Sequence, residues 1–276
     1  AGELLQRPQL RDGSARLKRH GVKPSPHGSH FQSGIERGTD CRVGSDGYAV
    51  EPVARPERPA WMRAIAPTQY FFVDYSFLEK PDFEGAKYVY TPPPRDKANQ
   101  DVLWDAVRRD TLSAISTDHC AFLWNGQKTI GKDDFSKIPN GGPGLENRLH
   151  MIHHFGVGEG RVGLNRMVEL LCTSPAKLFG LYPRKGTIAV GSDADIVIFD
   201  PAKRHLITAA SQQSKTDYNL YEGTEVVGDV VTVLLRGNVI VDGGEVVGKP
   251  GIGQFVRRAK FGEQLAATGA EAPAAA

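Results

Sequence analysis

The chain has 276 residues, with 34 Lys and Arg against 32 Asp and Glu and 40% apolar residues, which is the composition of an ordinary soluble protein. The net charge of +2 gives no general reason to expect nucleic acid or an acidic membrane as a partner. No run approaches the roughly 20 apolar residues of a membrane helix, and the start lacks the apolar core of a secretory signal. The three cysteines, Cys41, Cys120 and Cys172, show no CxxC spacing. We therefore expect neither a disulfide framework nor a zinc ribbon, and we expect a cytoplasmic location.

The charge is divided unevenly along the chain. Residues 1–66 hold 11 Lys and Arg and 7 Asp and Glu, or +4, whereas the remaining 210 hold 23 and 25, or −2. The first stretch is rich in Gly, Pro, Ser and Arg and shows no helical or strand period, so we predict that it is disordered. His27 and His30 form an HxxH pair there, but without a helix to place them a solvated loop is favoured over a metal site.

The patterning becomes regular from Thr68 onward. The aromatic run at 68–78 predicts a strand, and a second short strand is predicted at 87–90 before a proline triplet interrupts the backbone. A helix is expected from Asp96 to Arg109, with Asp96 as its N-cap, followed by a buried strand at 112–116. A helix followed by a strand with a carboxylate at its carboxyl end is typical of an α/β barrel, where that end holds the chemistry.

The second half of the chain reads as loop, then helices, then strands. Residues 121–145 are expected to be a long functional loop. Helices are predicted at 145–154 and 164–172, and a third is predicted to begin at Ser174-Pro175 and end at Gly180. Strands of a small β-sandwich are predicted at 186–190, 194–199, 230–235, 239–241 and 245–247.

Several segments together resemble a known family. They are TQYFFVDYSFLEKPDFEGAKYVYTPPPRD, ISTDHC, IPNGGPGLENR, PAKLFGLYPRKGTIAVGSDADIVIFDP and TDYNLYEGTEVVGDVVTVLLRGNVIVDGGE. From Thr68 to Arg258 the chain resembles the C-terminal half of D-hydantoinases and dihydropyrimidinases, which are metal-dependent cyclic amidohydrolases. The resemblance implies the α/β fold class, with the C-terminal part of a (β/α)8 TIM barrel beside part of a small β-sandwich.

The resemblance also implies a reaction, the opening of the ring amide of a hydantoin or a 5,6-dihydropyrimidine, as in pyrimidine degradation. In the family two divalent metal ions, usually Zn²⁺, hold the attacking hydroxide. Asp118 occupies the position of the aspartate that ligates a metal and acts as the general base. Thr91, where the family commonly has Ser, and Asn140 occupy the positions of substrate-binding main-chain groups. Small cyclic ureides and other copies of the chain, as a homotetramer, are the implied partners.

Other reactive side chains are expected to have structural roles. We expect His119 to face the barrel wall and Asn140-Gly141 to form a turn as well as a contact. We interpret His150, His153 and His154 as helix-surface or packing residues. Asp193 and Asp195 are interpreted as hairpin-turn residues, and Cys120 and Cys172 as packed thiols.

The family's other metal ligands have no counterpart in this chain. There is no His-x-His pair, and the family's metal-bridging lysine and two further histidines are missing. Asp118 would then be a lone ligand, and the chain is expected to be a partial family member, inactive by itself. We hypothesise that residues 1–66 are a wrong-frame translation, since a one-base shift of the Trp61-Met62 codons would encode Leu, Val or Met followed by Asp.

The predicted organisation has four parts: 1–66 unmatched, 67–183 barrel, 184–262 sandwich strands and C-terminal segment, and 263–276 a frayed tail. Two alternatives remain for the function. One is a non-catalytic dihydropyrimidinase-related interaction protein, which shares the loss of the histidines but has no need of Asp118 and Asn140. The other is an allantoinase or dihydroorotase, which the TPPPR and YPRKGT segments fit less well.

Overall fold

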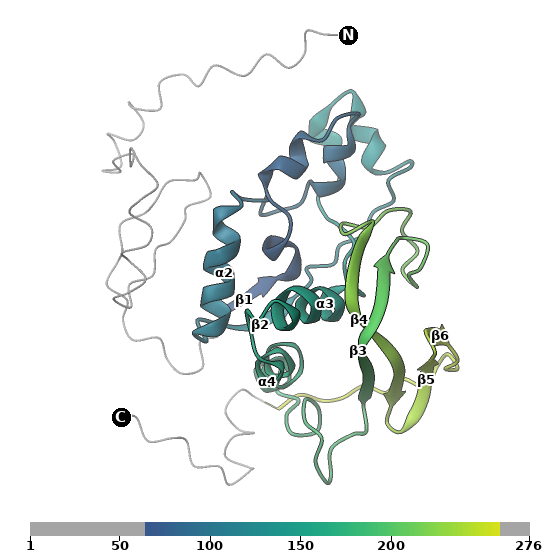
Figure 1. Cartoon of the computed structure of the whole chain (residues 1–276). Helices are drawn as coiled ribbons and strands as arrows, with labels where there is room; N and C mark the ends of the chain where they lie inside the picture. Colours follow the sequence, from purple (N-terminus) through teal and green to yellow (C-terminus); the bar gives the residue numbers. More distant parts are fainter. Residues whose placement is uncertain (1–63, 260–276) are drawn as a thin grey trace. The chain divides into compact units, whose positions relative to one another are not determined.

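A parallel strand pair and an antiparallel sheet form the framework of the computed structural model, which describes residues 64–259 (Figure 1). Strand β1 (Ala64–Pro67) pairs in parallel with β2 (Leu112–Ser116). The antiparallel sheet has the order β3-β4-β5-β6. This mixed architecture agrees with the predicted α/β class.

Strand β1 corrects the predicted boundary of the unmatched segment. Residues Ala64–Ala66 were included in the disordered stretch, but they pair with β2, and Ala66 is buried. A short apolar run without a period of its own becomes a strand because β2 supplies its hydrogen-bond partners. The other predictions for 1–63, including the His27/His30 pair and the altered frame at Trp61-Met62, lie outside the described residues, as does the tail 263–276.

The aromatic segment after β1 is not extended, so the strands predicted at 68–78 and 87–90 are wrong. Three 3₁₀ helices replace them, at Thr68–Phe71, Tyr75–Glu79 and Glu84–Tyr88. Aromatic strand propensity reflects packing on a pleated surface, and here the rings pack against helices and against one another instead. The Asp74 side chain accepts the Ser76 N–H at 2.9 Å and so starts the second of these helices.

Helix α2 (Ala98–Arg108) confirms the helix predicted between Asp96 and Arg109. Asp96 caps it as expected, since its carboxylate accepts the Ala98 N–H at 2.9 Å. The buried side chains of α2 are those of Val107 and Trp104. The Trp104 ring lies edge-on to Phe71, with ring centroids 4.9 Å apart. Trp104 thus anchors α2 beside β1 and β2.

The later helices each contain a wider π-helical turn. Helix α3 (Arg148–Met151) continues as a π-helix at Ile152–Gly158, and α4 (Leu164–Val168) continues through a π-helix at Glu169–Thr173 into α5 (Ser174–Leu178). The helices predicted at 145–154 and 164–172 are found, although α3 begins at Arg148, three residues later than predicted. Helix α5 begins at Ser174 with Pro175 in its first turn, as predicted, but Ser174 is itself helical and is not an N-cap. Thr173 is already helical, and the π turn accommodates Pro175, which lacks an N–H.

The buried face of α4 differs from the predicted one. Leu164 and Val168 share the predicted helical period, yet both are exposed, whereas Met167 and Leu170 are buried. All three α4 residues precede the π turn, so the buried face of α4 contains Met167, and it continues into the π turn at Leu170 and at Leu171, the one member of the predicted stripe that is buried. Gly180 ends this helical run at φ +73°, as predicted.

The antiparallel sheet confirms four of the predicted strands. They are β3 (Ile196–Ile207), β4 (Thr224–Leu235), β5 (Asn238–Asp242) and β6 (Glu245–Val246). The predictions at 194–199 and 230–235 missed the second half of β3 and the first half of β4, which pair with each other. The strand predicted at 186–190 is wrong, because no described strand lies beside it. Its Ile188 and Val190 side chains are 84% and fully exposed.

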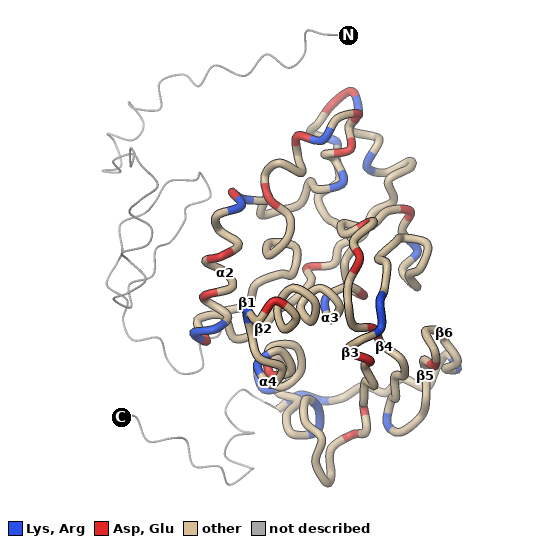
Figure 2. The backbone as a smooth tube through the Cα atoms, in the orientation of Figure 1, with Lys and Arg blue, Asp and Glu red and all other residues tan. Residues whose placement is uncertain are grey.

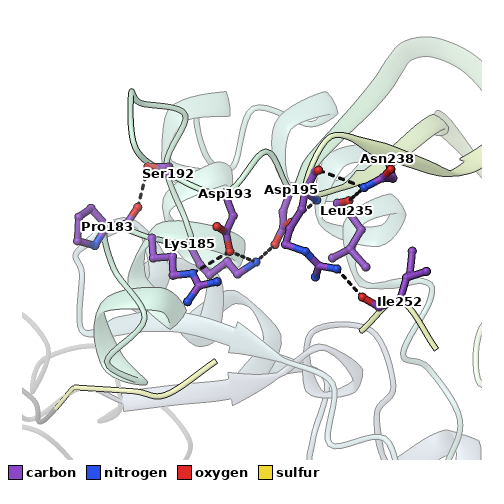
Figure 3. Close-up of polar contacts among 10 residues, drawn as sticks. Pro183, Lys185, Ser192, Asp193, Asp195, Leu235, Asn238 and Ile252 are labelled. Carbon is purple, nitrogen blue, oxygen red and sulfur yellow. Dashed lines mark hydrogen bonds and ion pairs between the residues drawn. The ribbon is translucent and has the colours of Figure 1, made fainter. Parts of the chain in front are cut away.

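A cluster of charged residues fixes the segment before β3 to the β4–β5 turn (Figure 3). Lys185 forms ion pairs with Asp193 and Asp195, and Asp195 also accepts the Arg236 N–H at 2.9 Å. The hydrogen bond from Lys185 holds the pKa of Asp193 below its usual value. The structural role predicted for these two aspartates is confirmed.

Histidines join the helix that follows α3 to strand β4. His153 and His154 hydrogen-bond the Val227 carbonyl and N–H at 2.8 and 3.1 Å, and His150 contacts Asp229 at 3.0 Å. Their predicted packing role is confirmed. The apolar cluster between this helix and the sheet consists of Val73, Tyr88, Tyr90, Met151, Ile207, Tyr218, Leu220, Tyr221 and Val226.

Charges of both signs are spread along the described chain, as Figure 2 shows. Among residues 64–259, no helix combines the length and apolar character needed to cross a membrane.

Candidate active site

Three chain segments meet beyond the carboxyl ends of β1 and β2. The segment after β2 pairs with the 139–144 segment, since His119 lies in a parallel bridge with Gly142 and the Cys120 N–H donates to the Gly142 carbonyl at 3.2 Å. The Gly141 N–H in turn donates to the Val89 carbonyl at 3.0 Å. The predicted site residues Asp118, Asn140 and Thr91 therefore lie on three adjoining segments.

Thr91 and Asn140 are in direct contact. The Thr91 hydroxyl donates to the Asn140 side-chain oxygen at 3.0 Å, and both residues are exposed. The structure thus brings together two residues that are 49 positions apart in the sequence.

Asp118 is exposed and has a left-handed backbone, with φ +47°. Such a conformation is uncommon outside glycine and persists where the surroundings fix it. Here the strand end is fixed on both sides, because the Thr68 hydroxyl donates to the Ser116 carbonyl at 2.7 Å and Arg148 donates to the Ile115 carbonyl at 3.0 Å. Asp118 therefore lies in a turn directly after a strand end that is fixed in place.

Tyr70 is a neighbour of Asp118 that the sequence reasoning missed. Burial, and then the negative charge of Asp118, raise the pKa of the Tyr70 phenol to about 12. The phenol consequently keeps its proton at neutral pH, and it donates that proton to the Pro92 carbonyl. In the sequence, Tyr70 lies within the aromatic run that was predicted to be a strand. Nothing in that pattern indicates that its side chain contacts the segment that carries Thr91.

His119 serves the backbone. Its Nδ1 accepts the Gly144 and Leu145 N–H groups at 3.2 and 3.3 Å. This pairing occupies the lone pair that a metal would need at that nitrogen. These contacts agree with the predicted structural role of His119. The ring contacts the loop at Gly144 and Leu145, however, and not the barrel wall as expected.

Lys128 is fully buried among these segments and was also missed. Its ammonium donates to the Val89 carbonyl at 2.8 Å and to the Pro139 carbonyl at 2.6 Å. Burial lowers its pKa to about 8. In sequence it is one of several lysines in a polar loop, a context that indicates a solvated side chain.

The described residues do not fit a two-metal centre by themselves. Asp118 is one carboxylate, and within 64–259 no group of three or more His, Cys, Asp or Glu side chains is arranged to hold a metal. Cys120 and Cys172 are free and exposed, so the prediction that they are packed thiols is wrong. Cys120 lies in the loop after β2, and Cys172 lies in the π-helix Glu169–Thr173, where partial burial raises the pKa of its thiol.

Comparisons with known proteins agree with the resemblance. The D-hydantoinase of Geobacillus stearothermophilus is 51% identical over 198 residues, which are 72% of this chain and 42% of that protein. The D-hydantoinase of Rhizobium radiobacter is 53% identical over 194 residues, or 70% of this chain and 42% of that protein. The chain thus spans less than half the length of these curated relatives.

Solved structures give the same result. The D-hydantoinase of Bacillus sp. AR9 superposes with a TM-score of 0.71 at 49% identity, over 72% of this chain and 43% of that one. The dihydropyrimidinase of Brevibacillus agri NCHU1002 superposes with a TM-score of 0.70, also at 49% identity, over the same shares of the two chains. These matches confirm the predicted fold class and the predicted resemblance. The model of the amidohydrolase family matches residues 91–240, which is more than half of the sequence, and the chain therefore belongs to the amidohydrolase family.

Proposed function

We propose that this chain supplies the C-terminal part of a hydrolase that opens the amide bond of hydantoins or 5,6-dihydropyrimidines. The observation that carries the proposal is the meeting of Asp118, Thr91 and Asn140 on three adjoining segments. Relatives that are about half identical to this chain are D-hydantoinases. The fold is that of a (β/α)8 barrel portion beside sandwich strands.

Each group has a defined part in this reaction. Water adds to the ring carbonyl, the carbon–nitrogen bond breaks, and the nitrogen leaves with a proton. Asp118 takes the proton from the water and returns it to the nitrogen, which suits an exposed carboxylate at a strand end. Main-chain groups at Thr91 and Asn140 orient the ring through its alternating N–H and C=O groups.

Divalent metal ions, zinc in our proposal, polarise the carbonyl in such hydrolases. Because the described residues of this chain offer one carboxylate for that purpose, we derive no step through the metal. The remaining ligands must come from residues that this chain does not provide at the family's positions. The proposal therefore holds that the 276-residue chain alone does not turn over either ring.

The test compares this chain with a chimaera. In the chimaera, the residues before Thr68 are replaced by the corresponding part of the Geobacillus stearothermophilus D-hydantoinase. We expect no stoichiometric metal and no hydrolysis from the chain alone, and both from the chimaera. Asp118→Asn in the chimaera should lower kcat by about 10²–10⁴-fold, with Asp105→Asn on α2 as the matched control.

The outcomes separate the alternatives. Metal uptake without turnover of hydantoin, dihydrouracil or allantoin would favour a non-catalytic relative. Turnover of allantoin alone would favour an allantoinase. Hydrolysis and stoichiometric zinc from the unmodified chain would refute the need for further ligands.

We also propose that the complete enzyme is a cytoplasmic homotetramer that acts in pyrimidine degradation. The cysteine content supports a reducing compartment, since the two described cysteines are unpaired. Light scattering on the active chimaera tests the assembly, and a monomer with full activity would contradict it.

A further inference from the structure

The side chain of Lys128 lies between the two segments that carry Thr91 and Asn140. Its two acceptors are the Val89 carbonyl, two residues before Thr91, and the Pro139 carbonyl, immediately before Asn140. One ammonium therefore contacts both segments at distances of 2.8 and 2.6 Å. The Val89 carbonyl also accepts the Gly141 N–H, which closes the connection between the segments.

The cost of burying a lysine indicates that this contact is specific. A buried ammonium is unfavourable unless its protons are bonded, and among residues 64–259 its hydrogen-bond partners are these two carbonyls and no carboxylate. The Phe122 ring, with its centroid 5.8 Å from Nζ, adds a cation–π contact. Since burial lowers the pKa of Lys128 to about 8, the group is still mainly an ammonium at pH 7.

The backbone around Lys128 is itself anchored, so the side chain can act as a fixed support. Its own N–H donates to the Leu123 carbonyl at 3.0 Å. Trp124 and Asn125, which precede Lys128 in the same loop, are fixed by Asp217. The Asp217 carboxylate accepts their N–H groups at 2.6 and 3.0 Å. The segment before β4 therefore holds in place the loop that carries Lys128.

We propose that Lys128 is a positioning residue that fixes the two substrate-binding segments, 89–92 and 139–142, against each other. The inference rests on the proposed function, because it assigns substrate binding to these segments. Lys128 itself does not contact the ring. It sets the spacing of the main-chain groups that do, and without it the segments separate while the rest of the fold stays intact.

The test uses hydrogen exchange on the full chain, with the Gly141 amide as reporter. Lys128→Met keeps the aliphatic stem and removes the amine. The matched control is Lys132→Met, at an exposed position of the same short 3₁₀ helix (Lys128–Lys132). We expect exchange in both segments to become at least about tenfold faster in Lys128→Met and to stay unchanged in α2 and β4. Lys128→Arg, which keeps the charge, should restore most of the protection.

Two results would overturn the inference. One is unchanged exchange at Gly141 in Lys128→Met; the other is equal acceleration in α2 and β4, which would make Lys128 a general stabiliser. Titration of dihydrouracil into the active chimaera adds a second measurement, in which Lys128→Met should bind at least about tenfold more weakly than Lys132→Met. If the chimaera binds no ring at all, the proposed function fails, while the exchange data still decide the role of Lys128.

Discussion

The parallel strand pair and the antiparallel sheet satisfy their backbone groups in opposite ways. Around β1 and β2, half-buried arginines donate to main-chain carbonyls: Arg166 donates to Val107 at the end of α2 and to Leu112, and Arg148 donates to Ile115. In the sheet, carboxylates accept free N–H groups. Those pairs are Asp195 with Arg236, Asp200 with Ala202, and Asp229 with Val230.

The difference follows from the number of strands in each sheet. A two-stranded parallel pair has two open edges, and the side chains of Arg148 and Arg166 bond carbonyls of β2. The four-stranded sheet pairs most groups internally and uses short side chains only at turns and bulges. We therefore expect single substitutions to be more damaging around β1 and β2 than in the sheet.

The largest expected effect is that of Arg166→Met. Arg166 donates to two carbonyls and pairs with Glu169 at 2.7 Å, so its removal leaves several groups without partners. We expect the free energy of unfolding to fall by about 3 kcal/mol in urea denaturation, chiefly from the lost hydrogen bonds to the two carbonyls, because the carboxylate partners are half exposed. Arg161→Met, which breaks more exposed pairs, should cost about 1 kcal/mol or less. Equal losses would break the comparison.

The pH dependence should also differ between the two regions. Lys128 loses its proton near pH 8 in the folded chain but near 10.5 when unfolded, so the unfolded state binds more protons in between. Stability should therefore rise with pH over this window, by at most about 3 kcal/mol, relative to Lys128→Met. A difference between the two unfolding curves that does not change with pH would contradict this.

The sheet should respond at acidic pH instead. Burial raises the pKa of Asp229, but hydrogen bonds from Lys203 and His150 outweigh it, and the net result is a lowered pKa. Its contribution to stability is thus present above the normal carboxyl pKa and is lost as the pH falls through the lowered value. Asp229→Asn should flatten the acid limb of the denaturation curve and leave the alkaline limb unchanged.

The junction between the two regions gives the next effect. Gly228 has φ +108°, and a Cβ there would lie 2.4 Å from His153 Nδ1. Gly237 also has a positive φ but has open space around it. Gly228→Ala should cost about 2 kcal/mol more than Gly237→Ala in thermal unfolding. Similar costs would mean that the helix and the sheet can separate freely.

The smallest effect on stability is expected at the exposed apolar segment before β3. Val190→Ser should change the free energy of unfolding by less than about 0.5 kcal/mol, because the side chain has no partner to lose. It should nevertheless reduce self-association, measured by light scattering, because exposed apolar residues favour aggregation. The prediction fails if the parent chain is already monodisperse, because there is then no self-association to reduce.

The sequence was most informative where hydrogen bonding and pattern agree. Strands β2 to β5 were predictable because apolar runs there end at Gly and Asp turns. The segment from Thr68 to Tyr88 was not, since its aromatic propensity is realised by packing between 3₁₀ turns. The π turns after α3 and α4 likewise leave no mark in the 3.6-residue period.

The candidate site divides in the same way. The resemblance pointed to Asp118, Thr91 and Asn140, and the contact between the last two is a property of the fold. The sequence offers no signal for Lys128 or Tyr70, because their importance lies in which distant carbonyls they reach. Long-range contacts to main-chain groups leave no local pattern.

The two neighbouring histidines at the junction have a consequence for their protons. His153 Nδ1 faces a carbonyl and must carry hydrogen, whereas His154 Nδ1 accepts an N–H and must be bare. Adjacent imidazoles on one helix therefore differ at Nδ1, and together they offer Val227 one donor and one acceptor, as the edge of another strand would. Nitrogen chemical shifts of the two rings would report this pairing of the helix with the sheet directly.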